Sequence, residues 1–499
     1  MDLLMKGIAV LLLGFLTIIP EIIGSIPSVP LLLVSFDGFR WDYLDLVKKD
    51  GSCHTPHFNY FVNTGVTIQN GGVRNAFITK TFPNHFSIVT GMYEENHGVT
   101  GNQIYDPKYD KYGSIPLNSS FWFNNGTEDG VGGAEPIWVT NQRSDPSRHS
   151  GVYFWPGSEI PLHNVTPTYR YRYDKSVPFE ERVDTVVNWL DKKMVNLALL
   201  YFNEPDSTGH QHGPDSMDMI KMICHMDGVL GRLHKGLQEV NLLDKVNIIL
   251  TSDHGMARIY PGQYIDLAKL APPHFYRVVG EKAVANIFPK EGKTEEVYQA
   301  LSRGQHMTVY HKESIPRQYH YMYNRRIAPI VAVAEEGWLI IADLSKEHPT
   351  ENGDHGYNNS LPDMNPIFIA RGPAFKKGKA VKQFNIVDIY PLMCHILDVQ
   401  PYRHDGSLAN IKDVLLEPPQ NKVLTGSGEQ VAHEEQSWWS VLLLTMSVVI
   451  LFTALLLIVY ALGICSWQRW TNRRKTTLPV YMEDEDRQHL LQDENTNNP

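Results

Sequence analysis

Short runs of consecutive apolar residues recur along the chain without the alternation that a half-exposed strand shows. The runs are Leu31–Phe36, Leu197–Phe202, Ile248–Thr251 and Ile367–Ala370. Strands that are covered on both faces have this pattern, because neither set of side chains meets water. We therefore predict four buried strands in a sheet that lies inside the protein.

Between these runs, apolar residues repeat every three or four positions, which is the period of an amphipathic helix. Two such stretches are Val183 to Leu190 and Met219 to Leu233. Strands that alternate with helices are typical of a parallel sheet with helices on both faces. The expected fold is an α/β fold with a mostly parallel central sheet flanked by helices.

Three of the four apolar runs are followed directly by residues with acidic or imidazole side chains. Asp37 follows the first run, Asp206 and His210 follow the second, and Asp253 and His254 follow the third. In open α/β sheets the ligand site lies beyond the carboxyl ends of the strands. We therefore expect these side chains to form one site at a single edge of the sheet.

Two longer apolar blocks lie near the ends of the chain. The first runs from Ile8 to Ile19 after a lysine, which is typical of a signal peptide over residues 1–24. An uncleaved N-terminal anchor is the alternative. The second runs from Trp438 to Cys465 without a charged residue and is long enough to cross a bilayer. Basic residues follow it directly, so we predict a transmembrane helix at 437–465 and a cytoplasmic tail at 466–499.

The residues between these blocks, 25–436, are expected to form the extracellular catalytic domain of a single-pass type I protein of the plasma membrane. Glycosylation sequons at Asn118, Asn125 and Asn164 agree with that location. A fourth sequon, at Asn358, lies three residues after His355. A glycan there would crowd the expected site, so we expect Asn358 to remain unmodified.

The tail contains an acidic cluster just before Leu490 and Leu491. An acidic residue four positions before a Leu-Leu pair resembles the dileucine endocytic signal that binds a clathrin adaptor. A solvated acidic tail is an equally good interpretation of the same residues.

Composition narrows the class of protein. The 499 residues include 45 Lys and Arg against 55 Asp and Glu, a net charge of −10, and 42% are hydrophobic. These values exclude a collagen-like or disordered chain. The acidic balance argues against a nucleic-acid partner, which would require a basic face. Only Cys53, Cys224 and Cys394 precede the second apolar block, so at most one internal disulfide is expected.

Aspartate and histidine side chains that converge from several strand ends suit zinc, which accepts small sets of nitrogen and oxygen ligands. Asp206 and His210 are four residues apart and would face the same way on a helical turn. Asp253 and His254 are adjacent, and His355 belongs to a second Asp-His-Gly tripeptide. Each group alone could make an ordinary cap or loop hydrogen bond. Together they indicate two metal ions.

Thr81 precedes an apolar stretch that we expect to be a helix. At a helix N-terminus, the helix dipole and a nearby cation both favour a negatively charged oxygen. Thr81 is therefore the candidate nucleophile. The alternative is that its side chain caps the helix.

These motifs together resemble those of the ecto-nucleotide pyrophosphatase/phosphodiesterase family within the alkaline phosphatase superfamily. The matching segments are residues 35–40 (SFDGFR), 80–85 (KTFPNH), 204–210 (EPDSTGH), 252–256 (SDHGM) and 354–357 (DHGY). They occur in the family's order, and the layout resembles that of its short type I members. The resemblance implies an alkaline-phosphatase-like fold, with a single catalytic domain plus one transmembrane helix.

The resemblance also implies two zinc ions. One would be held by Asp206, His210 and His355. The other would be held by Asp37, Asp253 and His254, with Thr81 as both nucleophile and ligand.

Three further residues match family positions that bind the substrate. Asn102 matches the asparagine that holds a phosphate oxygen together with the amide of Phe82. Tyr173 matches the tyrosine that stacks on a nucleotide base, and Phe82 would take the other face of the base. Tyr169 and Tyr171 are local competitors for the role of Tyr173.

The expected function is an extracellular zinc-dependent hydrolase that cleaves phosphodiester or pyrophosphate bonds of nucleotides. Dinucleoside polyphosphates or NAD-like compounds would be cleaved through a covalent threonyl-nucleotide intermediate. One alternative is a catalytically weak surface receptor that retains the fold. Another is a lipid-headgroup phosphodiesterase with the same chemistry. A sulfatase is not favoured, because Cys53 to Pro56 has the wrong spacing for a modifiable Cys-x-Pro-x-Arg motif.

Overall fold

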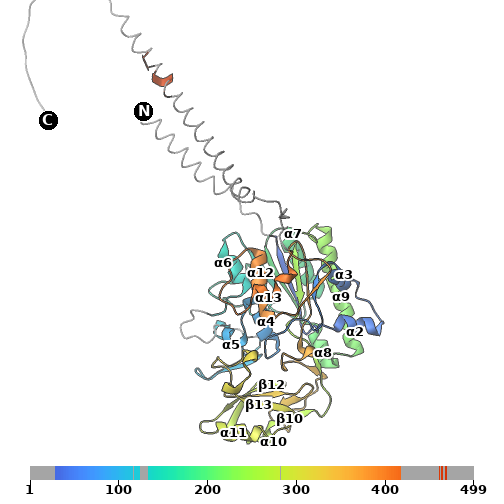
Figure 1. Cartoon of the computed structure of the whole chain (residues 1–499), viewed down its shortest axis with the longest axis vertical. Coiled ribbons are helices and arrows are strands. Elements are labelled where there is room, and N and C mark those ends of the chain that lie inside the picture. Colours follow the sequence, from blue (N-terminus) through green and yellow to red (C-terminus); the bar gives the residue numbers. More distant parts are fainter. Residues whose placement is uncertain are drawn as a thin grey trace, which may run out of the picture. The chain divides into compact units, whose positions relative to one another are not determined.

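The computed structural model describes residues 29–115, 117, 119–123, 133–280, 282–416, 460, 462–464 and 467–468. The chain divides into two units, Met1–Glu417 and Pro418–Pro499, and the sheets belong to the first (Figure 1). The expected signal peptide and most of the expected span and tail, including Leu490 and Leu491, lie outside the described residues. In the part of the chain that the structure describes, no helix has the length and apolar character of a membrane span.

An eight-stranded sheet forms the centre of the first unit (Figure 1). In spatial order its strands are β18 (Lys379–Val381), β2 (Val66–Ile68), β17 (Phe368–Arg371), β8 (Asn247–Thr251), β1 (Leu31–Phe36), β7 (Leu197–Phe202), β5 (Ser150–Tyr153) and β6 (Tyr169–Tyr171). Each predicted apolar run forms one of these strands, and the first two runs match β1 and β7 residue for residue. The prediction of four buried strands is confirmed.

The sheet is mixed, because β17 runs against its seven companions. It pairs antiparallel with β8 and β2, whereas β8, β1, β7, β5 and β6 pair in parallel, as do β18 and β2. The carboxyl end of β17 therefore lies at the opposite edge from those of β1, β7 and β8. This explains why the apolar run at Ile367–Ala370 is not followed by acidic or imidazole residues.

Helices cover both faces of the sheet. Leu32 and Val34 of β1 share a core with α2 (Tyr43–Asp50), α3 (Pro56–Thr64), α7 (Phe179–Asp191) and α9 (Met217–Glu239). Leu31 and Leu33 share the other core with α4 (Thr81–Thr90), α6 (Ile137–Ser144) and α12 (Ile389–Leu397). Successive residues of a strand point to opposite faces, so a continuous apolar run requires both cores. The two predicted helices are α7 and α9.

A second sheet lies outside the central layer, and the sequence pattern does not predict it. It is antiparallel, in the order β11 (Tyr276–Val279), β12 (Val284–Pro289), β14 (Ile330–Ala334) and β13 (Met307–His311). It shares a separate apolar core with α10 (Leu267–Leu270), α11 (Thr294–Leu301), β10 (Tyr264–Asp266) and β15 (Leu339–Ile341). The insertion lies between β9 (Ala257–Arg258) and β16 (Gly353–Asp354), which pair with each other.

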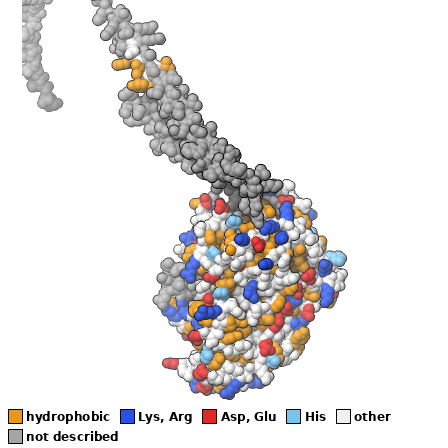
Figure 2. Space-filling view, viewed as in Figure 1, with side chains coloured by type: hydrophobic (Ala, Val, Ile, Leu, Met, Phe, Trp, Pro, Cys, Tyr) orange, Lys and Arg blue, Asp and Glu red, His pale blue; other side chains and the backbone are white. Residues whose placement is uncertain are grey.

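The first unit also contains smaller elements besides its 3₁₀ turns. They are α5 (Glu94–His97), α8 (Asp206–His212), α13 (Leu408–Ile411) and the hairpin of β3 (Gln103–Asp106) with β4 (Lys111–Ser114). On the face shown in Figure 2, basic and acidic side chains are interspersed. This face therefore lacks the continuous basic surface that nucleic-acid binding uses.

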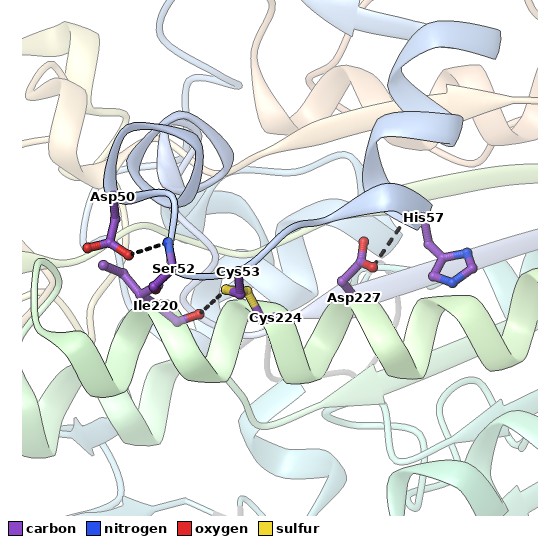
Figure 3. The surroundings of a disulfide bond; sticks show 7 residues. All are labelled: Asp50, Ser52, Cys53, His57, Ile220, Cys224 and Asp227. Carbon is purple, nitrogen blue, oxygen red and sulfur yellow. Dashed lines mark hydrogen bonds between the residues drawn. A yellow bond between two sulfur atoms is a disulfide. The ribbon is translucent and has the colours of Figure 1, made fainter.

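A disulfide between Cys53 and Cys224 joins the segment before α3 to α9 (Figure 3). Further along α9, Asp227 accepts hydrogen bonds from the backbone N–H groups of His57 at 3.3 Å and Phe58 at 2.7 Å. The first N–H groups of a helix have no partner within the helix, so Asp227 caps α3 from outside. Cys394 is a buried free thiol, which agrees with the expectation of at most one internal disulfide.

Candidate active site

Asp37, Asp253 and His254 come together at the carboxyl ends of two neighbouring strands. Asp37 follows β1 and Asp253 follows β8, and these strands pair in parallel, so their ends reach the same edge. His254 Nε2 lies 3.0 Å from Asp253 Oδ2 and 3.4 Å from Asp37 Oδ1. The three side chains are at most 2% exposed. We call this group the inner triad.

Asp206, His210 and His355 form a second group, the outer triad. Asp206 is the first residue of α8, and His210 lies one turn later on the same helix. His355 follows β16, where the chain leaves the inserted sheet. Asp206 Oδ1 lies 3.4 Å from His210 Nε2 and 3.6 Å from His355 Nε2. Asp206 is 18% exposed and His210 is 29% exposed, so this triad is open to solvent.

Hydrogen bonds to backbone carbonyls orient each histidine. Nδ1 lies 2.8 Å from the Gly255 oxygen in His254, 2.9 Å from the Gly353 oxygen in His210, and 2.7 Å from the Thr79 oxygen in His355. A carbonyl only accepts hydrogen bonds, so Nδ1 carries a proton and Nε2 of the neutral ring keeps its lone pair. That is the form in which a histidine binds a metal ion.

Each aspartate of the triads has one oxygen without a hydrogen-bond partner among the described residues. These oxygens are Asp37 Oδ1, Asp206 Oδ1 and Asp253 Oδ2. A buried polar atom that lacks a partner is costly. The ligand atoms within each triad lie within 4.8 Å of one another. Nitrogen and oxygen atoms arranged in this way fit a zinc ion in each triad.

The inner carboxylates differ in their electrostatic surroundings. Burial raises the pKa of Asp37 well above its usual value, and the charges of Asp253 and Asp206 raise it further. Burial opposes ionisation of Asp253 as well, but His254 and His85 outweigh it and hold the pKa of Asp253 well below its usual value. Like charges held this close favour a bound cation.

Thr81 is the first residue of α4, so it lies at a helix N-terminus as predicted. Its Oγ1 is 3.4 Å from His254 Nε2, which places the hydroxyl beside the inner triad. Lys80 occupies the N-cap position, and its own side chain makes no capping hydrogen bond. The alternative, that Thr81 serves as the cap, is therefore wrong.

Lys80 ties α4 to the outer triad. Its Nζ lies 2.8 Å from Asp354 Oδ1, and the Asp354 side chain is fully buried. The same oxygen accepts a hydrogen bond from the backbone N–H of His355 at 2.7 Å. One ion pair thus holds the helix that begins with Thr81 against the segment that carries His355.

Asn102 lies beside the first turn of α4. Its Oδ1 accepts a hydrogen bond from the backbone N–H of Phe82 at 3.0 Å. The two groups that were expected to donate jointly to a phosphate oxygen are therefore bonded to each other. In its expected role the Phe82 amide would donate to the substrate in addition to Asn102 Oδ1 or in place of it.

A cleft of about 1330 Å³ opens onto Thr81 and onto residues of both triads. Its aromatic lining residues are Phe82, Phe154, Trp155, Tyr169, Tyr171, Tyr173, Trp189 and Tyr201. Tyr173 is 42% exposed. Its ring centroid lies 5.4 Å from that of Phe154 and 6.1 Å from that of Tyr201.

The two competing tyrosines of the cleft pack elsewhere. Tyr171 stacks on Tyr153 at 4.5 Å, and Tyr169 lies 6.1 Å from Trp189. Tyr201, which is adjacent to Tyr173, donates a hydrogen bond to Asp37 Oδ2 at 2.6 Å. Of the three candidates, Tyr173 is therefore the one that reaches the inner triad through Tyr201.

The sequence pattern misses two supporting residues. Tyr201 belongs to an apolar strand run, where an aromatic residue is expected for packing alone. His85 is fully buried, with Nδ1 2.9 Å from the Thr81 carbonyl oxygen and 3.3 Å from Asp253 Oδ2. Its Nε2 lies 2.9 Å from Ser35 Oγ. Only its place in the motif at 80–85 could have indicated a role.

The predicted glycosylation sites stay predictions. Asn164 is exposed and has a left-handed backbone with φ of 62°. Asn118 and Asn125 lie outside the described residues. Asn358 is half-buried, and its Oδ1 accepts hydrogen bonds from the backbone N–H and the hydroxyl of Ser360, both at 2.9 Å.

Comparisons with known proteins all point to the same family. The family model described as type I phosphodiesterase / nucleotide pyrophosphatase matches residues 31–358. Ectonucleotide pyrophosphatase/phosphodiesterase family member 5 from Homo sapiens is 43% identical over 390 residues, which cover 77% of this chain and 77% of that protein. Bis(5′-adenosyl)-triphosphatase enpp4 from Mus musculus is 45% identical over 392 residues, which cover 78% of this chain and 81% of that protein.

Solved structures agree. The human family member 5 structure is 42% identical, has a TM-score of 0.72, and is matched over 78% of this chain and 100% of its own. Murine family member 5, solved as an inactive variant in complex with AMP, is 43% identical with a TM-score of 0.71 over the same shares. The chain therefore belongs to the type I phosphodiesterase/nucleotide pyrophosphatase family, a family of hydrolases with an alkaline-phosphatase-like α/β fold.

Proposed function

We propose that this protein is an extracellular zinc-dependent hydrolase that cleaves phosphodiester or pyrophosphate bonds of nucleotides. Dinucleoside polyphosphates and NAD-like dinucleotides are the candidate substrates. One observation carries the proposal: Thr81 lies beside the inner triad and lines an aromatic cleft together with Asp37 and Asp206, whose carboxylates each have an oxygen without a hydrogen-bond partner. A relative named bis(5′-adenosyl)-triphosphatase and a relative solved with AMP support a nucleotide substrate.

In this proposal, Asp206, His210 and His355 hold one zinc ion, and the inner triad with the Thr81 oxygen holds the other. When bound, zinc acts as a Lewis acid that stabilises charge on phosphoryl oxygens and lowers the pKa of a hydroxyl that it contacts. The carbonyls bonded to Nδ1 keep the three histidine rings in place for this purpose.

Thr81 supplies the nucleophile. Its Oγ1 forms a bond to phosphorus, the bond to the leaving group breaks with its electron pair, and the hydroxyl proton passes to solvent. Water then attacks the phosphorus of the threonyl-nucleotide and the bond to Oγ1 breaks. A nucleoside monophosphate leaves and the Thr81 hydroxyl is restored. The N-terminus of α4 stabilises negative charge that develops on Oγ1.

The remaining contacts orient the substrate. Asn102 and the Phe82 amide donate hydrogen bonds to a phosphoryl oxygen, which stabilises the charge that accumulates there. Tyr173 and the Phe82 ring enclose the nucleotide base. Offset or edge-on aromatic contacts of this kind add to the energy of burial.

We also propose that residues 25–436 lie outside the plasma membrane, after a signal peptide and before a single span at 437–465. The Cys53–Cys224 disulfide supports this location, because disulfides persist in oxidising compartments. The exposed sequon at Asn164 supports it too.

Enzymatic removal of glycans from surface protein should increase mobility on a gel, and Asn164→Gln should reduce that shift. Replacing Leu490 and Leu491 should raise the surface level if the tail binds a clathrin adaptor.

The central test uses purified full-length protein in detergent and a nitrophenyl nucleotide, diadenosine polyphosphate or NAD as substrate. Thr81→Ala should lower kcat/KM by at least about 1000-fold, on the order of 4 kcal/mol of transition-state stabilisation. EDTA should abolish wild-type turnover. Thr294→Ala is the matched control, because Thr294 is likewise the first residue of a helix, α11, but is exposed on the inserted part.

A Thr81→Ala variant that keeps a tenth of the wild-type rate would contradict the proposal. Wild-type protein that binds zinc but cleaves none of these substrates would favour the receptor alternative. Faster turnover of choline phospholipids than of nucleotides would favour the lipid-headgroup alternative.

A further inference from the structure

Arg182 is a buried cation close to the cleft. It lies in the first turn of α7, and its side chain is inaccessible to solvent. Its hydrogen bonds go to backbone carbonyls: Nη1 donates to the Tyr201 oxygen at 3.1 Å, and Nη2 donates to the Val177 oxygen at 3.0 Å. No carboxylate of the described chain forms an ion pair with it. Burying a charge without a counter-ion is unfavourable, so the position calls for a physical reason.

Aromatic rings take the place of a counter-ion. The Arg182 guanidinium lies 4.7 Å from the ring centroid of Phe179, 4.9 Å from that of Phe154 and 5.9 Å from that of Phe202. A cation within roughly 6 Å of a ring centroid is attracted by the electrons of the ring face. The buried charge is therefore held by two carbonyls and three rings, and one of those rings, Phe154, lines the cleft.

Phe154 has an unusual backbone conformation. Its φ is 71°, in the left-handed region that bulky residues rarely adopt. The residue follows β5, where the chain turns into the Trp155 to Gly157 segment of the cleft wall. Residues held in such conformations persist only where the surroundings fix them, and they cluster at functional sites. Arg182 contacts the ring of the residue at this turn.

Both residues that Arg182 holds on this side are neighbours of Tyr173. Phe154 meets the Tyr173 ring edge-on at 5.4 Å, and Tyr201 meets it at 6.1 Å. Tyr201 also donates to Asp37 Oδ2. A continuous set of contacts thus leads from Arg182 to the proposed base-stacking tyrosine and to the inner triad.

We propose that Arg182 is a positioning residue for nucleotide selectivity: it holds Phe154 and Tyr201 so that Tyr173 can stack on the base of the substrate. The inference rests on the proposed function, because it assigns Tyr173 to the base. Arg182 itself does not touch the substrate. Its loss should therefore weaken binding of ligands that carry a base and leave phosphodiester cleavage as such intact.

The test compares two diesters on full-length protein. The nitrophenyl ester of thymidine 5′-monophosphate carries a base, and bis(p-nitrophenyl) phosphate does not. Arg182→Met should raise KM for the nucleotide ester at least tenfold and weaken AMP binding in calorimetry by a similar factor. Its kcat on the base-free diester should stay within threefold of wild type, and its zinc content should be unchanged. Arg182→Lys keeps a cation without the planar fork and should recover part of the KM effect.

Arg232→Met is the matched control. Arg232 forms an exposed ion pair with Asp184 on α7, at 2.6 Å and away from the cleft. We expect it to leave both KM values and AMP affinity unchanged. If Arg182→Met lowers kcat/KM by the same factor on both diesters, or leaves the affinity for AMP unchanged, the positioning role is overturned.

If Arg182→Met does not fold, Phe154→Leu provides the same test, because it removes the ring between Arg182 and Tyr173. It should shift the KM ratio of the two diesters in the same direction, and an unchanged ratio would overturn the proposal. Wild-type protein that cleaves neither diester would instead contradict the proposed function.

Discussion

The inner and outer triads contain the same residue types but are held in different ways. The inner triad comes from the ends of two paired strands, β1 and β8, and is almost fully buried. The outer triad combines the first turn of α8 with the segment that leaves the inserted sheet, and two of its side chains are partly exposed. The parallel sheet alone places the inner triad, whereas the outer triad also requires the insertion to be docked. We expect the inner site to be rigid and the outer site to exchange with solvent.

The largest expected effect is in the inner triad. His254→Ala should lower kcat/KM by at least about 1000-fold, because the proposed zinc site beside Thr81 would lose a ligand. Steady-state kinetics with a nitrophenyl nucleotide measures the effect. His274→Ala, an exposed histidine of the inserted part, is the control. A His254→Ala variant with more than a tenth of wild-type activity would show that the inner triad is not required for turnover.

The outer triad should tolerate a change better. His210→Ala should lower kcat/KM by about 100-fold, roughly 2.7 kcal/mol. Added zinc should recover part of the loss, because water can enter the vacated position of a side chain that is 29% exposed. Titration of activity against zinc concentration checks this. A loss as large as that of His254→Ala, with no recovery, would show that the two sites do not differ as described.

A smaller effect on activity is expected from changing a residue that supports the inner triad. Tyr201→Phe removes the hydrogen bond to Asp37 Oδ2 and keeps the ring. Loss of a group that orients a metal ligand costs about 10- to 100-fold in affinity or activity, and we expect the lower end. Zinc titration and kcat/KM measure it. Tyr171→Phe, at a cleft tyrosine stacked on Tyr153, should change neither quantity.

The last expected effect is on stability rather than on activity and concerns a buried carboxyl group outside the triads. Both oxygens of Glu94 lack hydrogen-bond partners in other described residues, and burial raises the pKa of Glu94 well above its usual value of 4.5. The folded protein therefore binds a proton that the unfolded chain releases above that pH. The free energy of unfolding should fall by about 1.4 kcal/mol per pH unit until the folded-state pKa is passed.

Glu94→Gln should remove this pH dependence and raise stability at pH 7.5, as measured by urea unfolding at pH 5 and pH 7.5. Glu239→Gln, at an exposed residue, should leave the slope unchanged. An unchanged slope in Glu94→Gln would mean that Glu94 is already ionised in the folded protein, which would contradict this prediction.

Much of the central sheet could be predicted from the sequence, because strands buried on both faces leave continuous apolar runs. β5 was missed because its sequence, Ser-Gly-Val-Tyr, is not continuously apolar, and Gly151 provides space for the Trp189 ring. Of the four strands of the inserted sheet, only β14 is a continuous apolar run, so the pattern does not reveal the sheet as a whole. β12 contains Asn286, which is satisfied by Tyr321 and the Ala328 amide and breaks the apolar pattern.

The triads could be predicted because their residues sit directly after strands or in short Asp-His pairs. Pattern alone does not reveal that Asn102 pairs with the Phe82 amide, since that bond depends on how the segment before β3 meets the first turn of α4. Nothing in the sequence pattern indicates that Arg182 is buried either. An arginine in the first turn of a helix is ordinarily solvent-exposed.

The most direct test of the account is the zinc content of purified full-length protein by plasma mass spectrometry. We predict two zinc ions per wild-type chain, and one in His254→Ala and in His210→Ala without added zinc. Wild-type protein that contains no zinc, or variants that both keep the wild-type count, would show that the triads do not each hold one ion.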